Sequence, residues 1–191
     1  DLVWQPFFES DIYLTGERFS YYSPMANAII AAPPQLAVEQ LAHNLENGNL
    51  GNGEWALRLY QNVGNFEWAI YGYRGFYKMP EGFNPASGQT YFPRMNSLGA
   101  SLRGPFSSGI IHSEFAFHQS VDDGSGTDPW VPNSEWRFLL GYEQELISQL
   151  TLSLQYYLEK ITDYQQLLNH SPSPSTEPSE LRHTATLRIT Y

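Results

Sequence analysis

Cysteine is absent from the 191 residues, and lysine occurs only as Lys78 and Lys160. The missing thiols exclude disulfides, thiolate metal sites and a cysteine nucleophile. Ten basic side chains against 20 acidic ones leave a net charge of −10. This charge disfavours a nucleic-acid partner, and it also disfavours peripheral docking on anionic lipid head groups.

Long apolar runs are also missing. No stretch of 18 apolar residues occurs, so the sequence encodes no membrane-spanning helix. The mean hydropathy of −0.40 would suit a soluble protein. It would equally suit a membrane barrel, because half of each barrel strand faces a polar interior. Only the order of apolar and polar residues can separate the two classes.

That order is an alternation, and it is clearest in the stretch 134–160. Two arms, joined by a short polar turn, each alternate apolar and polar side chains over ten or more residues. A pleated strand can bury one side of such a pattern, whereas a helix with a period of 3.6 residues cannot. Strands of this length exceed the 5 to 6 residues usual in soluble sheets. They match the roughly 9 to 11 residues that a tilted strand needs to cross a bilayer.

The same alternation recurs along the chain, with regular punctuation. Further alternating segments occupy 1–5, 53–62, 65–75, 96–103, 109–120 and 180–191. Short turns near Val63, Pro105 and Ile147 alternate with long loops at 6–53, 76–94, 121–133 and 161–179. Short turns at one end and long loops at the other are typical of barrels in the bacterial outer membrane.

The hairpins EWALRLYQNVGNFEWAIYGYRG and LGASLRGPFSSGIIHSEFAF, the stretch 134–160 and the last segment RHTATLRITY together carry a family resemblance. The chain resembles Gram-negative outer-membrane β-barrels of the porin-like kind over 53–191. The resemblance implies an all-β fold, an antiparallel up-and-down transmembrane β-barrel in the cell outer membrane. It also implies one barrel domain, or part of one, over 1–191. Aromatic residues, 15% of the chain, concentrate toward the strand ends, as in the aromatic girdles of such barrels.

A barrel of this kind has two faces, and the alternation divides the residues between them. The apolar side chains are expected to contact the lipid bilayer; they include Trp136, Phe138, Leu140, Leu150, Leu152, Leu154, Leu187 and Ile189. The charged side chains are expected to line the lumen; they include Arg58, Arg103, Arg137, Arg182, Arg188, Glu114, Glu143 and Glu159. Further carboxylates of the same set are Glu54, Glu67 and Glu145.

A lumen lined by both signs of charge can select which small polar or ionic solutes pass by diffusion. The sequence therefore predicts an outer-membrane channel with small polar solutes as its partners. Two alternatives stay open. The charges can be salt bridges that only fill a narrow barrel, or the barrel can act as a receptor, adhesin or structural protein through its long external loops.

The loops carry two further expectations. The long external loop 6–52 has a helix signal, because Pro34 suits a first helical position, Leu36, Leu41 and Leu45 form an apolar stripe, and Asn47 with Gly48 suits a stop. The loop 161–179 contains SPSPSTEPS, a composition that predicts no regular structure.

Metal and catalytic sites are not expected. His112 and His118 share a strand face with Glu114, but at about 3.4 Å per residue they stand roughly 20 Å apart, too far to share an ion. The loop 122–128 clusters carboxylates with glycines but lacks the twelve-residue calcium pattern and its closing Glu, which favours a solvated acidic turn. No G-x-S-x-G motif occurs. We expect neither an enzyme nor a cofactor.

The first segment bears on the size of the barrel. Residues 1–5 give at most about 17 Å of strand, which falls short of an apolar band of roughly 25 Å. We therefore expect these residues to be part of a larger barrel. The alternative is a complete eight-stranded barrel, in which the segment 1–5 would pair with the segment 180–191.

Overall fold

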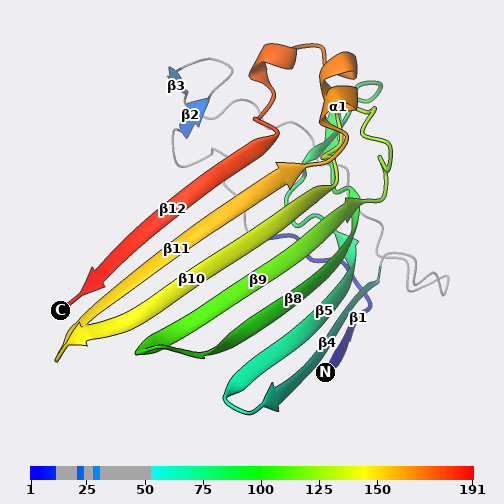
Figure 1. Ribbon diagram of the computed structural model, residues 1–191. Coiled ribbons are helices and arrows are strands. Elements are labelled where there is room, and N and C mark those ends of the chain that lie inside the picture. The colour runs from blue at the N-terminus through cyan, green and yellow to red at the C-terminus, as the bar shows by residue number, and fades with distance from the viewer. Residues whose placement is uncertain (12–20, 24–27, 31–52) are drawn as a thin grey trace.

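A computed structural model describes residues 1–11, 21–23, 28–30 and 53–191 of the chain. Its main feature is an eight-stranded sheet in the order β1-β4-β5-β8-β9-β10-β11-β12, with every neighbouring pair antiparallel (Figure 1). Sequential pairing of this kind confirms the all-β, up-and-down prediction. The strands are β1 (Leu2–Gln5), β4 (Glu54–Val63), β5 (Phe66–Phe76), β8 (Arg94–Phe106), β9 (Gly109–Ser120), β10 (Glu135–Ile147), β11 (Leu150–Ile161) and β12 (Leu181–Thr190).

The strands after β1 are long, and their connections alternate in length. Strands β4 to β12 of this sheet have 10 to 13 residues. Each of the three tight turns places one residue at positive φ: Gly64 at 61°, Ser107 at 54° and Gln149 at 67°. Positive φ lets a two-residue turn follow the twist of its strands. These turns lie at one end of the sheet, and the long loops lie at the other (Figure 1).

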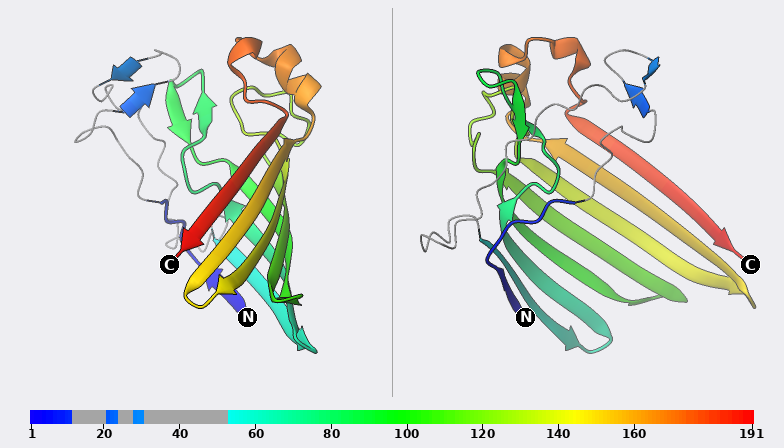
Figure 2. Two further views of the ribbon diagram at one scale, coloured as in Figure 1. Left: turned by 60° about the vertical axis from the view of Figure 1, so that its left-hand side comes forward. Right: turned by 180° about the vertical axis from the view of Figure 1, so that it is seen from behind.

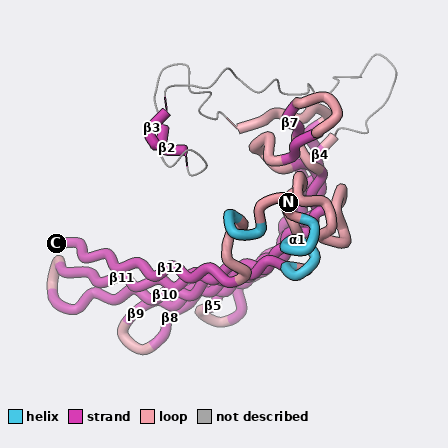
Figure 3. The backbone as a smooth tube through the Cα atoms, turned by 90° about the horizontal axis from the view of Figure 1, so that it is seen from above, coloured by secondary structure: helices cyan, strands magenta, loops and turns pink. Residues whose placement is uncertain are grey.

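The sheet is curved and open (Figures 2 and 3). Strand β1 pairs with β4, and β12 pairs with β11, so these two strands form the edges. The pairing of β1 with β12 that a closed eight-stranded barrel requires is not made. The fold prediction is thus confirmed for a curved antiparallel sheet, while closure into a barrel stays a prediction.

The expectation of no regular structure in 161–179 was wrong. Helix α1 (Tyr164–His170) and the 3-10 turn η2 (Pro174–Thr176) lie there (Figure 1). The residues before the proline-rich stretch, YQQLLNH, include Gln and Leu, which favour helices. Leu167 is buried, and its packing fixes this short helix against the loops. The proline-rich composition therefore ended the α-helix at His170, but it still allowed one 3-10 turn.

Two small hairpins lie within the long connections. Strands β6 (Gly82–Asn84) and β7 (Gln89–Tyr91) pair inside the connection between β5 and β8. Strands β2 (Tyr21–Ser23) and β3 (Ala28–Ile30) pair inside the first loop. The helix expected over 34–48 lies outside the described residues. None of the helices in the described part of the chain has the length and apolar character needed to cross a membrane.

The register divides the sheet into two faces, because residues directly opposite each other on paired strands share a side. The apolar face carries Phe138 with its partners Phe115 and Leu158, and Leu154 with its partner Leu187. The same pairing rule places all eight residues that were expected to contact lipid on this face. The polar face is the opposite side, and the register places all eight charged residues that were expected to line the lumen on it.

The apolar face is not covered by any other described part of the chain. Leu98 and Ile189 are each 64% exposed, although they lie on strands far apart in the sheet. Buried apolar residues gather at the loop end instead, where the rings of Phe8, Phe76 and Phe92 pack with centroids 4.7 to 5.2 Å apart. A soluble sheet would pack its apolar face into a core. Here that face is presented outward over its whole length.

Gly109 begins β9 and supports its close approach to β10. A Cβ atom added there would overlap the backbone oxygen of Glu143 and the ring of Tyr142. We therefore expect Gly109→Ala to destabilise the fold by about 1–3 kcal/mol. Gly124→Ala is the control, because no atom lies within 4 Å of a Cβ at that position. Denaturant unfolding followed by tryptophan fluorescence measures both; equal losses would contradict the close packing at Gly109.

Candidate functional site

Three charged side chains form a row across the last three strands of the polar face. Arg137 of β10 lies directly opposite Glu159 of β11, which lies directly opposite Arg182 of β12. The Glu159 carboxylate is 3.2 Å from Nη2 of Arg182 and 3.7 Å from Nε of Arg137. Opposite charges on directly facing residues attract across an antiparallel ladder. The row therefore holds β10, β11 and β12 together on the side that faces away from the apolar residues.

Glu135 contacts both arginines; it stands two residues before Arg137 on β10, on the same face of the strand. Its carboxylate accepts a hydrogen bond from Nε of Arg137 at 2.6 Å, and it lies 3.5 Å from Nη2 of Arg182. The carboxylates of Glu135 and Glu159 are largely buried, with side chains 11% and 18% exposed, while the two arginine side chains are about 40% exposed. Glu135, Arg137, Glu159 and Arg182, which we call the charge cluster, contain equal numbers of each charge. Multiple contacts to each guanidinium restrict how it can move.

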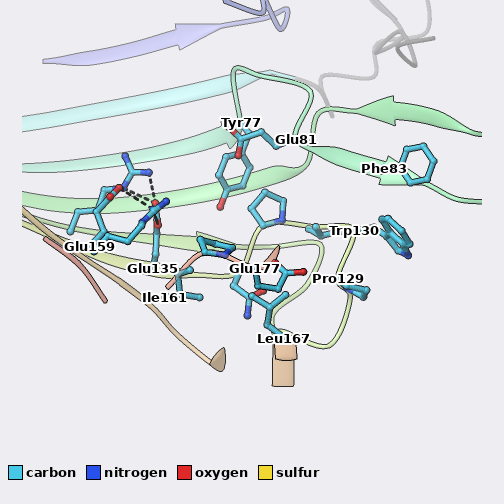
Figure 4. A pocket seen from close by; sticks show the side chains of 16 residues that line it. Tyr77, Glu81, Phe83, Pro129, Trp130, Glu135, Glu159, Ile161, Leu167 and Glu177 are labelled. Carbon is cyan, nitrogen blue, oxygen red and sulfur yellow. Dashed lines mark hydrogen bonds and ion pairs between the residues drawn. The ribbon is translucent and has the colours of Figure 1, made fainter. Parts of the chain in front are cut away.

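A hollow of about 580 Å³, which we call the loop chamber, lies between the charge cluster and the long loops. Figure 4 shows Glu135 and Glu159 at one end of it and Phe83 and Trp130 at the other, with Tyr77 between them. Its lining comes from the polar face and from the connections β5–β8, β9–β10 and β11–β12, three of the four at the loop end: Tyr77, Glu81, Phe83, Pro129, Trp130, Val131, Pro132, Asn133, Glu135, Arg137, Glu159, Ile161, Leu167, Glu177, Pro178 and Arg182.

Hydrogen bonds between the loops hold the walls of the chamber. The backbone N–H of Phe83 donates to the carbonyl of Trp130 at 3.0 Å, and their rings lie 5.3 Å apart. The side-chain amide of Asn133 donates to the carbonyl of Thr162 at 3.0 Å. Thr162 in turn donates its backbone N–H and its hydroxyl to the carbonyl of Ser134, each at 2.8 Å. The three connections are thus tied to one another.

The acidic loop 122–128 is folded around one of its own carboxylates. Asp123 is buried, and it accepts hydrogen bonds from the backbone N–H groups of Thr127 at 3.2 Å and Asp128 at 3.0 Å. The hydroxyl of Ser125 also donates to it at 3.2 Å. Asp122 accepts from the backbone N–H of Arg94 at 2.8 Å. The loop was expected to be a solvated acidic turn, but Asp123 is its buried structural centre.

Three polar atoms in the chamber lining are buried without a partner among the described residues. They are the hydroxyl of Tyr77, Nε of Arg182 and Oδ1 of Asn133. Burial raises the pKa of the Tyr77 hydroxyl, and the nearby charge of Glu135 raises it further. Burial also raises the pKa of Glu81, with a smaller contribution from Glu135. An unsatisfied buried donor or acceptor costs free energy, so each of these groups would gain from a bound partner.

A second ion pair lies at the loop end of β4 and β5, outside the chamber. Glu54 is buried, and it accepts hydrogen bonds from the Tyr73 hydroxyl at 2.5 Å and from Nζ of Lys78 at 2.6 Å. Lys78 also donates to the carbonyl of Glu9 at 3.2 Å and lies 4.9 Å from the ring centroid of Phe8. These contacts anchor the segment that follows β1.

The other residues expected in a lumen are spread over the polar face. Arg58 pairs with Asp1 at 2.9 Å near one edge of the sheet, where both side chains are well exposed. Arg103 lies opposite Glu67 and His112, and a separate hollow of about 390 Å³ brings it near Glu114 and Glu143. Arg188 lies opposite Ser153. Of the predicted set, Arg137, Glu159 and Arg182 are joined by ion pairs into one cluster, while Arg103, Glu114 and Glu143 share the separate hollow.

Sequence reasoning missed several residues of the chamber. Glu135 carried a usable signal, since it stands two residues before Arg137 and so belongs to the same strand face. The loop residues Tyr77, Glu81, Trp130 and Glu177 carried none, because their positions depend on how three separate loops fold over the sheet.

Comparisons with models of protein families, with curated proteins and with solved structures found no match to this chain.

Proposed function

We propose that this sheet forms part of the wall of a channel in the outer membrane. Small polar or ionic solutes would pass through this channel by passive diffusion. The observation that carries the proposal is the separation of two faces across eight strands, most of them 10 to 13 residues long. The apolar face would contact lipid, and the polar face would line the path of the solute. Strand length supports this, because about 9 to 11 residues suffice to cross a bilayer at a tilt.

The exposure of the apolar face is the energetic argument. Removing one large apolar side chain from water is worth about 1.5–3 kcal/mol, and Leu59, Leu98, Leu154, Leu187 and Ile189 are each about half exposed or more. Continuous apolar patches of this extent mark a binding surface or a membrane contact. A hydrocarbon phase would cover the exposed apolar side chains of every strand at once, since the apolar face extends from β1 to β12.

The charge cluster would act on solutes as they leave the loop chamber. Its arginines and carboxylates lie side by side across three strands, so they produce an electric field along the sheet surface rather than a single sign of potential. Fixed charges at a narrow part of a polar path set its ion preference.

Recording from planar bilayers that contain the full-length protein tests the proposal. We expect step conductances, and we expect Arg137→Ala or Arg182→Ala to change their size or their preference for cations over anions. Arg74→Ala is the matched control, because Arg74 lies on the apolar face, opposite Trp55 and Asn96. The absence of conductance steps would contradict a channel lined by the polar face. An effect of Arg74→Ala on conductance equal to that of the other two variants would contradict it as well.

A second candidate function is a non-conducting receptor or adhesin of the same membrane. The observation that favours it is the hydrogen bonding between the loops, which builds a structured chamber at the loop end. Silent bilayers together with saturable ligand binding at the loops would favour this candidate.

A further inference from the structure

The charges that line the loop chamber are unbalanced. Four carboxylates line it, those of Glu81, Glu135, Glu159 and Glu177, against the two guanidinium groups of Arg137 and Arg182. The charge cluster neutralises itself, since both arginines pair with Glu135 and Glu159. Glu81 and Glu177 are therefore left over, and within the described part of the chain neither makes an ion pair. Among the described residues, Glu177 accepts a hydrogen bond from the hydroxyl of Ser171, at 2.6 Å.

Aromatic rings make up the other part of the wall. Tyr77, Phe83 and Trp130 line the chamber, and Figure 4 shows Phe83 and Trp130 together at the end away from the charge cluster. An aromatic ring attracts a cation to its face, and Trp does so most strongly. Carboxylates beside aromatic rings thus give two independent attractions for the same class of ligand.

From these observations we propose that the loop chamber binds a small organic cation with an alkylammonium head group and a hydroxyl or carbonyl a few bonds away. The head group would lie against the aromatic wall near Glu81, where the unpaired negative charge is. The polar tail would reach the Tyr77 hydroxyl and Nε of Arg182, which are buried without a partner among the described residues. The inference rests on the proposed function, because it names the class of solute that the polar face would carry.

Other ligand classes fit these contacts less well. An anion would meet two unpaired carboxylates, while both guanidinium groups are already engaged. A purely apolar ligand would leave Glu81 and Glu177 without a counterion and the Tyr77 hydroxyl and Nε of Arg182 unsatisfied. A cation with no apolar surface would be attracted to the ring faces, but it would gain nothing from burying apolar surface against the three rings. The chamber's volume of about 580 Å³ is sufficient for a small molecule of the proposed kind.

Choline is the probe, and 3,3-dimethylbutan-1-ol is its matched control, because the two share a shape and differ in a nitrogen that carries the charge. Both are titrated by calorimetry into the full-length protein folded in detergent micelles. We expect saturable choline binding that is at least about tenfold tighter than binding of the neutral compound. Equal binding would overturn the proposal in favour of an apolar pocket, and the absence of saturable choline binding would overturn it outright. Tighter binding of butyrate would overturn it in favour of an anion site.

Variants locate the binding and separate it from folding. Glu81→Gln is expected to weaken choline binding about three- to tenfold, and Trp130→Leu is expected to weaken it to a similar degree. Glu67→Gln removes the same charge from a distant part of the polar face and should leave the affinity unchanged. Circular dichroism shows whether each variant keeps its strands. An unchanged affinity for choline in a folded Glu81→Gln protein would overturn the placement of the cationic head group near Glu81.

The outcome also separates this inference from the proposed function. Choline binding is measured in micelles, whereas conduction is measured in bilayers. Conduction without choline binding would reject only the cation site. Choline binding without conduction would reject the channel and keep the site.

Discussion

Replacing Leu154 with arginine is expected to destabilise the folded protein in lipid vesicles by about 2–4 kcal/mol. Leu154 lies near the middle of β11, on the apolar face, opposite Tyr142 and Leu187. Its side chain is 48% exposed, so no described part of the chain would shield a new guanidinium there. If the apolar face contacts lipid, that charge must enter hydrocarbon or pull water and head groups toward it.

The neighbouring substitution Ser153→Arg is the matched control. Ser153 lies on the polar face, opposite Glu143 on one side and Arg188 on the other. Because the arginine would reach water and a carboxylate, we expect a change of less than about 1 kcal/mol. Reversible denaturant unfolding in vesicles, followed by tryptophan fluorescence, measures both free energies. Equal losses, or a compact soluble monomer in buffer without lipid or detergent, would contradict membrane contact by the apolar face.

Most of the sheet was predictable because its strands are amphipathic and long. Alternation with a period of two identifies a strand and both of its faces in one step. The segments 109–120 and 180–191 were expected within a residue of the strands β9 and β12. The short turns were predictable for the same reason, since the alternation stops at them and resumes with a short interval.

The sequence contained a signal for the register of β10 and β11. A two-residue turn at 148–149 pairs Ile147 with Leu150, and continuing that pairing would set Arg137 opposite Lys160. Both arms carry their apolar residues at even positions, so this register would mix the two faces. The structure has a bulge between Glu145 and Ile147, and Arg137 lies opposite Glu159 instead. One extra residue on one strand restores the match between faces.

The loops could not be predicted at the same level. The helix α1 and the hairpin β6–β7 are short, and their local sequence preferences are weak without the contacts that bury Leu167 and tie Phe83 to Trp130. The chamber depends on three connections that lie far apart in the sequence and meet over the sheet. Sequence pattern thus placed Arg137 on the correct face, but it gave no indication that Tyr77 or Trp130 lies nearby.

Among the residues of the charge cluster, Glu135 is the one whose replacement is expected to lower the free energy of unfolding most. Glu135→Gln keeps the size of the side chain but leaves Arg137 and Arg182 with Glu159 as their only cluster carboxylate. Removing one partner of a buried ion pair costs about 3–5 kcal/mol. The arginine side chains are about 40% exposed, so solvent screens part of this cost. We therefore expect a loss of about 2–3 kcal/mol in denaturant unfolding.

The control for Glu135→Gln is Glu180→Gln, which removes a carboxylate from an exposed pair with Lys160 at 3.9 Å. Exposed pairs contribute little, so its cost should stay below about 1 kcal/mol. A double-mutant cycle with Arg182→Ala isolates the interaction itself, because it subtracts whatever each single substitution does elsewhere. If Glu135 joins β10 to β12 through Arg182, the two losses will add to more than the loss in the double variant. Strict additivity would mean that the 3.5 Å contact contributes nothing, and that Glu159 alone holds Arg182 in the row.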